Sequence, residues 1–155
     1  MSLLLKNVKV LGGSQNLPES SDIYIRGEMI SAIGSFPHKE TAQMIDGRGL
    51  YAAPGFIDMH AESDHYLSLW HYPSQEDFLR QGVTTILGGH GGVSLAPLLY
   101  GELKSLREWV ASPRLNINWH SVREFLSTLS KRPLGVNFAT LAGHTSIRRA
   151  LTRDL

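Results

Sequence analysis

The chain of 155 residues has 15 basic and 14 acidic side chains, 42% hydrophobic residues and no cysteine. This length and composition are typical of a folded globular protein with a buried core. The net charge of +1, without a basic run among aromatic residues, argues against a nucleic-acid partner or a membrane surface. The lack of cysteine excludes disulfides and thiolate metal ligands. No signal peptide or membrane span is predicted, so we expect a cytoplasmic protein.

The first fifty residues are predicted to form short β-strands separated by turns. Branched aliphatic residues fill the segment 3–11. Residues 21–34 place alternating apolar positions on both sides of Gly27, which predicts a hairpin with Gly27 at a positive φ. A further strand pair is predicted around Asp46 and Gly47. No helical periodicity of any length is found in this segment, so residues 1–53 are predicted to form a small β-sheet.

From Pro54 onwards the pattern changes to alternating helices and strands. A helix is predicted to begin at Ser74 and to end before Gly82, which takes the C′ position. The apolar segment 83–88 is typical of a buried parallel strand. A second helix is predicted over 101–112, with one apolar face made of Leu103, Leu106, Trp109 and Val110.

The last third of the chain continues this alternation. Ser121 and Glu124 have the spacing of a capping box at the start of a helix, whose apolar stripe comprises Val122, Phe125, Leu126 and Leu129. The segment 135–143 is predicted to be a buried strand, followed by a helix with Thr145 as candidate N-cap. This order predicts a parallel α/β sheet over residues 54–155, with the domain boundary near Ala52–Pro54.

Three polar clusters follow predicted strands, and each carries a histidine close to the strand end. They are the segments 58–65, 88–92 and 142–146, with His60, His90 and His144. Chemistry in parallel α/β folds takes place at the carboxyl ends of the strands. A single loop histidine is commonly structural or solvated, so a polar loop rich in histidine remains the alternative to a site. Three such histidines at the same edge favour a site.

His60 and Glu62 are candidate metal ligands because residues i and i+2 of an extended segment point to the same face. Imidazole and carboxylate groups are ordinary zinc ligands. Asp58 and Asp64 share this parity and could orient His60 by accepting a hydrogen bond. The alternative is that both aspartates cap adjacent turns.

The glycines around His90 have two interpretations. Glycine-rich turns can cradle phosphates, but this one lacks the lysine and the following Ser or Thr of a P-loop. We therefore expect the glycines of segment 88–92 to permit a tight turn or a close backbone approach at the strand end.

The segment APGFIDMHAESD (53–64) resembles the first barrel strand of the amidohydrolase superfamily, which reads Pro-Gly-Phe-Ile-Asp-x-His-x-His. The segments RQGVTTILGGHGGVSLAPLL (80–99) and GVNFATLAGHTSIRRAL (135–151) resemble its N-acyl-D-amino-acid deacylase (D-aminoacylase) branch. The first fifty residues are similar to the small β-sandwich that precedes the barrel in this superfamily. The resemblance implies an α/β chain, with a β-sandwich portion at 1–53 and the first βα units of a (β/α)8 (TIM) barrel at 54–155.

Two positions depart from the pattern of the family. Glu62 stands where the superfamily has its second histidine, and Gly91 stands where the branch has a metal-binding cysteine. His90 is adjacent and could substitute for the thiolate if the chain adopts a loop conformation there. The metal ligands that this chain is expected to supply are thus His60, Glu62 and His90. Asp58 and Asp64 are expected to orient His60 as hydrogen-bond acceptors. His144 matches the histidine of the branch's Gly-His-x-x-[Ile/Leu]-Arg motif and is expected on the substrate side.

The resemblance implies a hydrolase that uses zinc or another divalent metal to cleave the amide bond of a small N-acyl amino acid, with D-stereochemistry. The metal would lower the pKa of a bound water and polarise the scissile carbonyl, and a carboxylate would pass the proton to the leaving amine. In the superfamily that carboxylate and two further histidines come from later strands, so the catalytic base is expected beyond residue 155.

A complete (β/α)8 barrel takes about 250 residues, whereas about a hundred residues follow the β-rich start, enough for roughly three βα units. We therefore expect the N-terminal third of an enzyme, not catalytically competent alone. Its open sheet edge would be covered by a missing C-terminal portion or by a second copy in a homo-oligomer. The alternative is a stand-alone, non-catalytic domain that dimerises or binds a partner through this edge.

Overall fold

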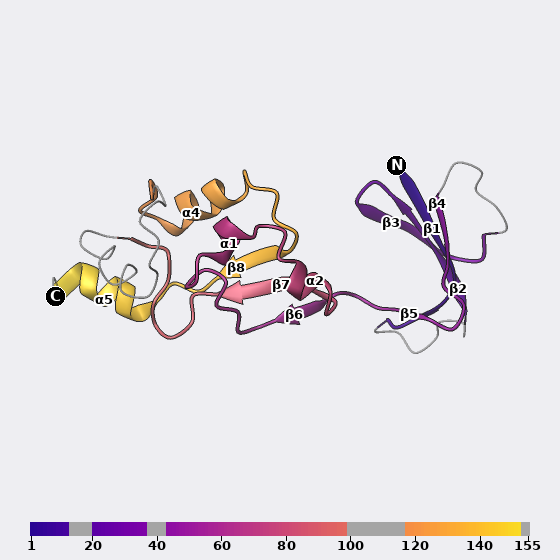
Figure 1. The fold of residues 1–155 in the computed structure, drawn as a ribbon, viewed down its shortest axis with the longest axis horizontal. Coiled ribbons are helices and arrows are strands. Elements are labelled where there is room, and N and C mark those ends of the chain that lie inside the picture. Colours follow the sequence, from indigo (N-terminus) through magenta and orange to yellow (C-terminus); the bar gives the residue numbers. More distant parts are fainter. Residues whose placement is uncertain (13–19, 37–42, 99–116, 153–155) are drawn as a thin grey trace. The chain divides into compact units, whose positions relative to one another are not determined.

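The computed structural model describes residues 1–12, 20–36, 43–98 and 117–152 (Figure 1). The chain divides into two compact units, Met1–Pro54 and Gly55–Leu155. Each helix within the described ranges falls short of the length and apolarity that crossing a lipid bilayer requires. The helix expected over 101–112 lies outside the described residues.

The first unit is a five-stranded mixed β-sheet (Figure 1). Its strands are β1 (Ser2–Val10), β2 (Ser21–Arg26), β3 (Met29–Gly34), β4 (Gln43–Asp46) and β5 (Tyr51–Ala52). Their order is β3-β2-β1-β4, and β5 also pairs with β1. The pairs β1–β2 and β2–β3 are antiparallel, whereas β4 and β5 run parallel to β1. The predicted small β-sheet is therefore present.

One local prediction in this unit is confirmed and one is wrong. The hairpin of β2 and β3 turns at Gly27, whose φ is 59°. The strand pair expected around Asp46 and Gly47 does not form, because β4 and β5 both pair with β1 instead of with each other. The turn after β4 follows β1: the amide of Gly47 donates to the carbonyl of Lys6 at 2.7 Å, and that of Lys9 donates to Leu50 at 2.9 Å.

A buried carboxylate on β2 binds β1 and the segment after β3. Asp22 is 6% exposed and accepts the amide N–H groups of Asn7 and Phe36, both at 2.9 Å. The Lys6 ammonium lies 3.8 Å from the same carboxylate. Burial alone would raise the pKa of Asp22, but the two amides and Lys6 outweigh it and hold this pKa below its usual range.

The second unit contains the parallel sheet that the sequence predicts. Strands β6 (Phe56–Asp58), β7 (Val83–Gly88) and β8 (Asn137–Thr140) are parallel and adjacent in this order. The last two strands, predicted to be buried, are only partly so. Ile86 is fully buried and shares a face with Phe138, whereas Asn137 is exposed on the opposite face beside Thr85. From these two strands, Val83, Ile86 and Phe138 contact the hydrophobic cluster of this unit.

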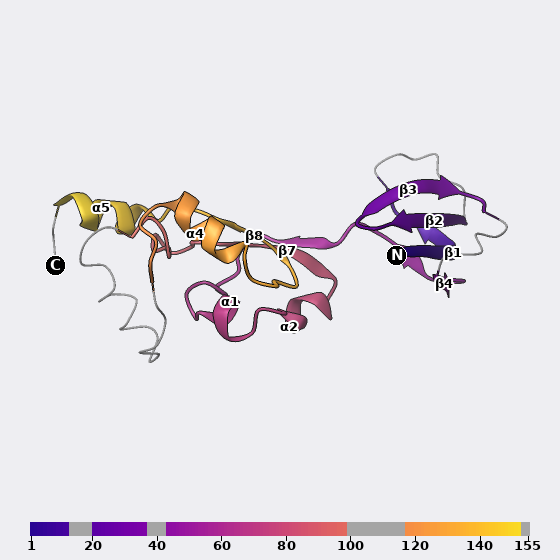
Figure 2. The same ribbon diagram turned by 90° about the horizontal axis from the view of Figure 1, so that it is seen from above.

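Four helices of the second unit are described: α1 (Ser68–His71), α2 (Glu76–Leu79), α4 (Val122–Leu129) and α5 (His144–Thr152). In Figure 2, α1 and α2 lie on the same side of β7. The helix expected from Ser74 begins two residues later, at Glu76. The cause is Gln75, whose side chain donates to the carbonyls of Ser68 and Tyr72 at 3.1 and 2.7 Å and fixes the residue in a left-handed conformation.

The capping box of α4 is confirmed. The Ser121 hydroxyl accepts the amide N–H of Glu124 at 3.2 Å, and the Glu124 carboxylate accepts the amide of Ser121 at 3.0 Å. On the predicted stripe Phe125 and Leu129 are buried, whereas Leu126 is exposed.

The start of α5 differs from the prediction by one residue, because the helix begins at His144 and Thr145 lies inside its first turn. The amide of Thr145 donates to the carbonyl of Gly92 at 2.8 Å. A backbone N–H at the start of the helix, which a local N-cap would otherwise bind, is thus bound by a distant loop.

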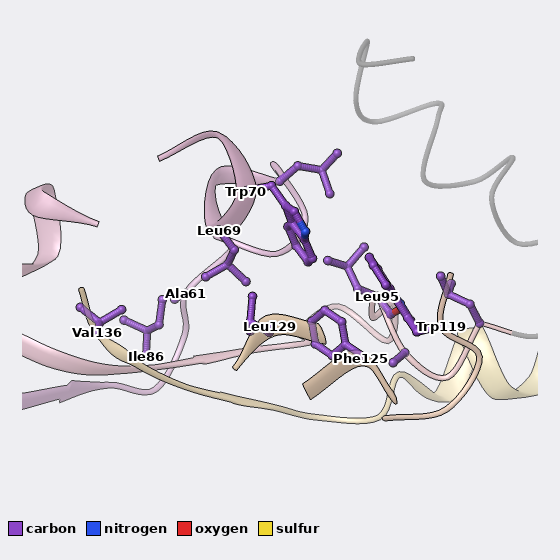
Figure 3. Close-up of a cluster of buried hydrophobic side chains, with 12 residues drawn as sticks. Ala61, Leu69, Trp70, Ile86, Leu95, Trp119, Phe125, Leu129 and Val136 are labelled. Carbon is purple, nitrogen blue, oxygen red and sulfur yellow. The ribbon is translucent and has the colours of Figure 1, made fainter. Parts of the chain in front are cut away.

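An aromatic cluster forms the core of the second unit (Figure 3). The rings of Trp70 and Trp119 stack with centroids 5.5 Å apart, and Phe125 lies within 6 Å of both. The Trp119 indole N–H donates to the carbonyl of Leu95 at 2.7 Å, so its polar atom is satisfied in the core. Together with Ile86 these residues join α1, α4 and the segment after β7 to the sheet.

Replacing Asp22 by asparagine should destabilise the first unit by about 1–3 kcal/mol at neutral pH, because the charged acceptor of two amides is lost. The folded-state pKa of Asp22 is lowered, so its contribution is present above the ordinary pKa of 3.8 and disappears as pH falls through the folded value. The difference between Asp22→Asn and wild type should therefore shrink in acid. Urea unfolding followed by amide NMR signals of β1 and β2 measures it.

The exposed Glu28→Gln in the same unit is the matched control and should change stability little at either pH. An equal loss for Asp22→Asn at acid and neutral pH would contradict the role given to its charge.

Candidate functional site

The three histidines singled out in the sequence follow the carboxyl ends of three neighbouring parallel strands. His60 comes two residues after β6, His90 two residues after β7, and His144 is the first residue of α5 after β8. Because the strands are parallel, these segments leave the sheet at the same edge.

The structure brings two of these histidines into contact. The imidazole rings of His60 and His90 stack with centroids 4.2 Å apart and planes inclined by 29°. His90 Nε2 lies 3.1 Å from the carbonyl oxygen of Leu87, and since a carbonyl only accepts, Nε2 carries the proton. The lone pair of a neutral His90 is then on Nδ1 and available to a metal or a proton donor. The same Leu87 carbonyl accepts the amide of Ala61 at 2.9 Å, which ties the segment of His60 to β7.

The segment of His60 and Glu62 does not have the extended conformation that the sequence argument assumed. Strand β6 ends at Asp58, and the chain bends at Met59 and His60. The cause is local: Asp58 Oδ1 accepts the amide N–H of His60 at 2.9 Å and closes a tight turn. Asp58 therefore contacts the backbone of His60, and Glu62 is exposed.

Asp64 joins the segment after β6 to the turn after β7. Its side chain is fully buried, and Oδ2 accepts the amide N–H of Gly89 at 2.9 Å. Burial is the largest influence and raises the pKa of Asp64. Oδ1 has no hydrogen-bond partner in the described chain, and a Cβ added to Gly88 would lie 2.7 Å from it. Asp64 thus holds the backbone of Gly88 and Gly89 directly.

The glycine-rich turn has the close backbone approach that the sequence predicts. A side chain at Gly89 would collide with the backbone of Leu141, which follows β8. Gly91 has a φ of +66°, and a Cβ built there would meet no atom within 4 Å in the described structure. The turn is thus packed tightly at Gly89 and open at Gly91, the residue next to His90.

Sequence reasoning missed His65, which takes part in the same network. Its Nε2 lies 2.8 Å from the carbonyl oxygen of Val93, so it links the segment after β6 to the segment after β7. Its place beside Asp64, in a run of four polar residues, was the only signal. His144 is exposed at the start of α5.

A divalent metal would need more ligands than this edge offers. Over the described ranges, no three His, Asp or Glu side chains come together as a group that could hold an ion. The stacked rings of His60 and His90 supply at most two nitrogen ligands, whereas zinc takes four. The described residues alone therefore do not fit a complete metal centre.

The neutral form of His90 should be the Nε2–H tautomer, because Nε2 donates to Leu87. 15N NMR of the neutral imidazole should show Nε2 protonated and Nδ1 unprotonated. The exposed His71 is the comparison and should show a mixture of both tautomers. A His90 ring protonated at Nδ1 would contradict this geometry.

Gly88→Ala should destabilise the second unit by about 1–3 kcal/mol, because the added methyl group meets the Asp64 carboxylate. The loss should become smaller in an Asp64→Ala background, where the obstacle is gone. Gly91→Ala, whose Cβ has free space but a positive φ, is the matched control: its cost should be the same in both backgrounds.

Urea unfolding followed by tryptophan fluorescence, which reports Trp70 and Trp119, measures this double-mutant cycle. Strict additivity of Gly88→Ala and Asp64→Ala would show that the two residues are not in contact.

No family model matches the chain, but two curated proteins of Alcaligenes xylosoxydans xylosoxydans are similar over nearly all of it. An N-acyl-D-aspartate deacylase is 34% identical over 151 residues, which are 97% of this chain and 30% of that protein. A D-aminoacylase is 32% identical over 153 residues, 99% of this chain and 31% of that protein. The chain thus spans about 30% of the length of the curated relatives it matches.

Solved structures give the same result for the fold. The N-acyl-D-glutamate deacylase of Bordetella bronchiseptica, complexed with zinc and a phosphonate inhibitor, has a TM-score of 0.81 at 28% identity. It matches 98% of this chain, which covers 31% of that protein. A D-aminoacylase with a binuclear metal centre has a TM-score of 0.77 at 30% identity, with 99% of this chain and 32% of that protein matched. By sequence and by fold, the chain is similar to D-aminoacylases over about 30% of their length.

Proposed function

We propose that this chain supplies the first wall of the active site of an N-acyl-D-amino-acid deacylase. This hydrolase would cleave the C–N amide bond of a small N-acyl amino acid and release a carboxylate and a free D-amino acid. The observation that carries the proposal is the similarity to two such deacylases over 97–99% of the chain. The pairing of His60 and His90 at the strand ends supports it.

We propose that β6, β7 and β8 are the first strands of a (β/α)8 barrel and that the unit Met1–Pro54 is part of a β-sandwich. The parallel order of the three strands supports the barrel. Such a barrel would place the segments of His60, His90 and His144 at its catalytic face.

In this proposal His60 and His90 bind a divalent metal, zinc by preference, through their ring nitrogens. The Leu87 carbonyl holds the proton of a neutral His90 on Nε2 and leaves the lone pair on Nδ1, an arrangement common around metal-binding histidines. Glu62 would be the third ligand from this chain in the complete enzyme, although in the described structure it does not form a group with the two histidines. Asp58 and Asp64 fix the backbone of the two histidine segments. His144 lies on the substrate side. The remaining ligands and the catalytic base come from the part of the enzyme that this chain does not span.

The second candidate is a non-catalytic domain that associates through the sheet. The observation that favours it is that β6 and β8 each pair with a single neighbour, β7, among the described strands. Open strand edges of this kind are ready to pair with another chain. A second copy would leave the His60–His90 pair without catalytic partners.

The deciding experiment joins these 155 residues to the part of the Alcaligenes N-acyl-D-aspartate deacylase that they do not cover. With zinc, the chimera should release free amino acid from N-acetyl-D-aspartate, or from another N-acetyl-D-amino acid of a panel, and not from the L-isomers. His60→Ala should lower kcat/KM by on the order of 100-fold, as expected for loss of a metal ligand. The exposed His71→Ala should leave it unchanged.

A folded, zinc-loaded chimera that cleaves no N-acyl amino acid would overturn the deacylase proposal. If the unmodified chain then sediments as a stable dimer, the second candidate takes its place.

A further inference from the structure

Two buried serines from distant segments meet beside the histidine turns. Ser94, in the segment after β7, is 1% exposed, and Ser146, in the first turn of α5, is 3% exposed. The amide N–H of Ser94 donates to the Ser146 hydroxyl at 3.1 Å, across 52 positions of sequence. We call Ser94 and Ser146 the serine clasp.

The serine clasp belongs to a wider set of bonds between the same two segments. The Ser94 hydroxyl donates to the carbonyl of Ala96 at 2.6 Å and accepts the amide of Gly143 at 2.8 Å. The amide of Thr145 donates to the carbonyl of Gly92 at 2.8 Å. A side chain at Gly143 would collide with the backbone of Gly92 and Ser94, so the two segments lie in direct contact.

The chemistry of the clasp is directional. A buried hydroxyl costs stability unless it is hydrogen-bonded, whereas alanine would fill nearly the same space without that requirement. The hydroxyl groups determine which backbone amide is paired with which oxygen atom, and apolar packing cannot determine such a pairing. A network of this kind serves to define geometry more than to add stability.

Both histidine segments are attached to the clasp at short range. The carbonyl of His90 accepts the amide of Val93 at 3.3 Å, directly before Ser94. His144 lies between Gly143 and Thr145, and the amides of both these residues are bonded to the segment after β7. A shift of Ser94 relative to Ser146 would therefore move the two histidines relative to each other.

We propose that Ser94 and Ser146 are positioning residues that hold His90 and His144 in a fixed relation, so that the loops after β7 and β8 form one rigid wall. The assignment rests on the proposed function in that His90 and His144 serve the reaction. Neither serine needs to touch substrate or metal for this role.

The test compares Ser146→Ala with wild type in the whole chain, without metal or substrate. The amide of Ser94 should exchange with solvent at least tenfold faster, and the ring signals of His90 and His144 should shift. Ser146→Thr keeps the hydroxyl and should restore both readouts. Ser21→Ala is the matched control, since Ser21 is buried in the first unit and its hydroxyl has no partner in the described structure.

Unchanged ring signals and unchanged Ser94 exchange in Ser146→Ala would overturn the proposal. If that variant does not fold, hydrogen exchange of the unaltered chain decides: the amides of Ser94, Gly143 and Thr145 should open together in one event, and independent opening would overturn it. These readouts involve no catalysis. An inactive chimera with an intact clasp refutes the deacylase proposal alone, and an active chimera whose clasp amides open independently refutes only the clasp.

Discussion

The hydrogen bond from the Gly89 amide to the buried carboxylate of Asp64 holds together the two strand ends on which the site depends. A fully buried carboxylate is costly, and the raised pKa of Asp64 reports that cost. What the molecule gains is a fixed separation between the segments of His60 and His90. The glycine at position 88 is part of the same constraint, because any side chain there would occupy the space of the carboxylate.

Around this bond the second unit is organised in two layers. Behind the strand ends, the cluster of Trp70, Trp119 and Phe125 packs α1 and α4 against one face of the sheet. At the strand ends, the backbone carbonyl oxygens of Leu87, Gly92 and Val93 accept hydrogen bonds from residues of the segments after β6 and β8. The hydrophobic cluster thus supports loops whose geometry is set by hydrogen bonds. That division suits a site in which histidine rings must be presented at defined positions.

Features set by neighbouring residues, the hairpin at Gly27 and the capping box of Ser121 and Glu124, could be predicted from the sequence. The parallel order of the second unit could also be predicted, because it follows from the alternation of strands and helices. Features set by individual distant contacts could not. The start of α2 depends on Gln75 reaching Ser68, and the start of α5 on Gly92. The site shows the same division: the sequence predicted three histidines at one edge, but not the stacking of two of them or the turn that Asp58 closes at His60.

The contact between His60 and His90 is the structural basis of the proposed function, and it can be observed without metal, substrate or substitution. Their stacked rings, with centroids 4.2 Å apart, should give nuclear Overhauser effects between the ring protons of the two imidazoles. The Trp70 and Trp119 rings, at 5.5 Å in the same unit, provide the internal reference. Cross-peaks between the histidines would support a common site. Their absence, with the tryptophan cross-peaks present, would contradict the account of the site given by Asp64 and Gly89.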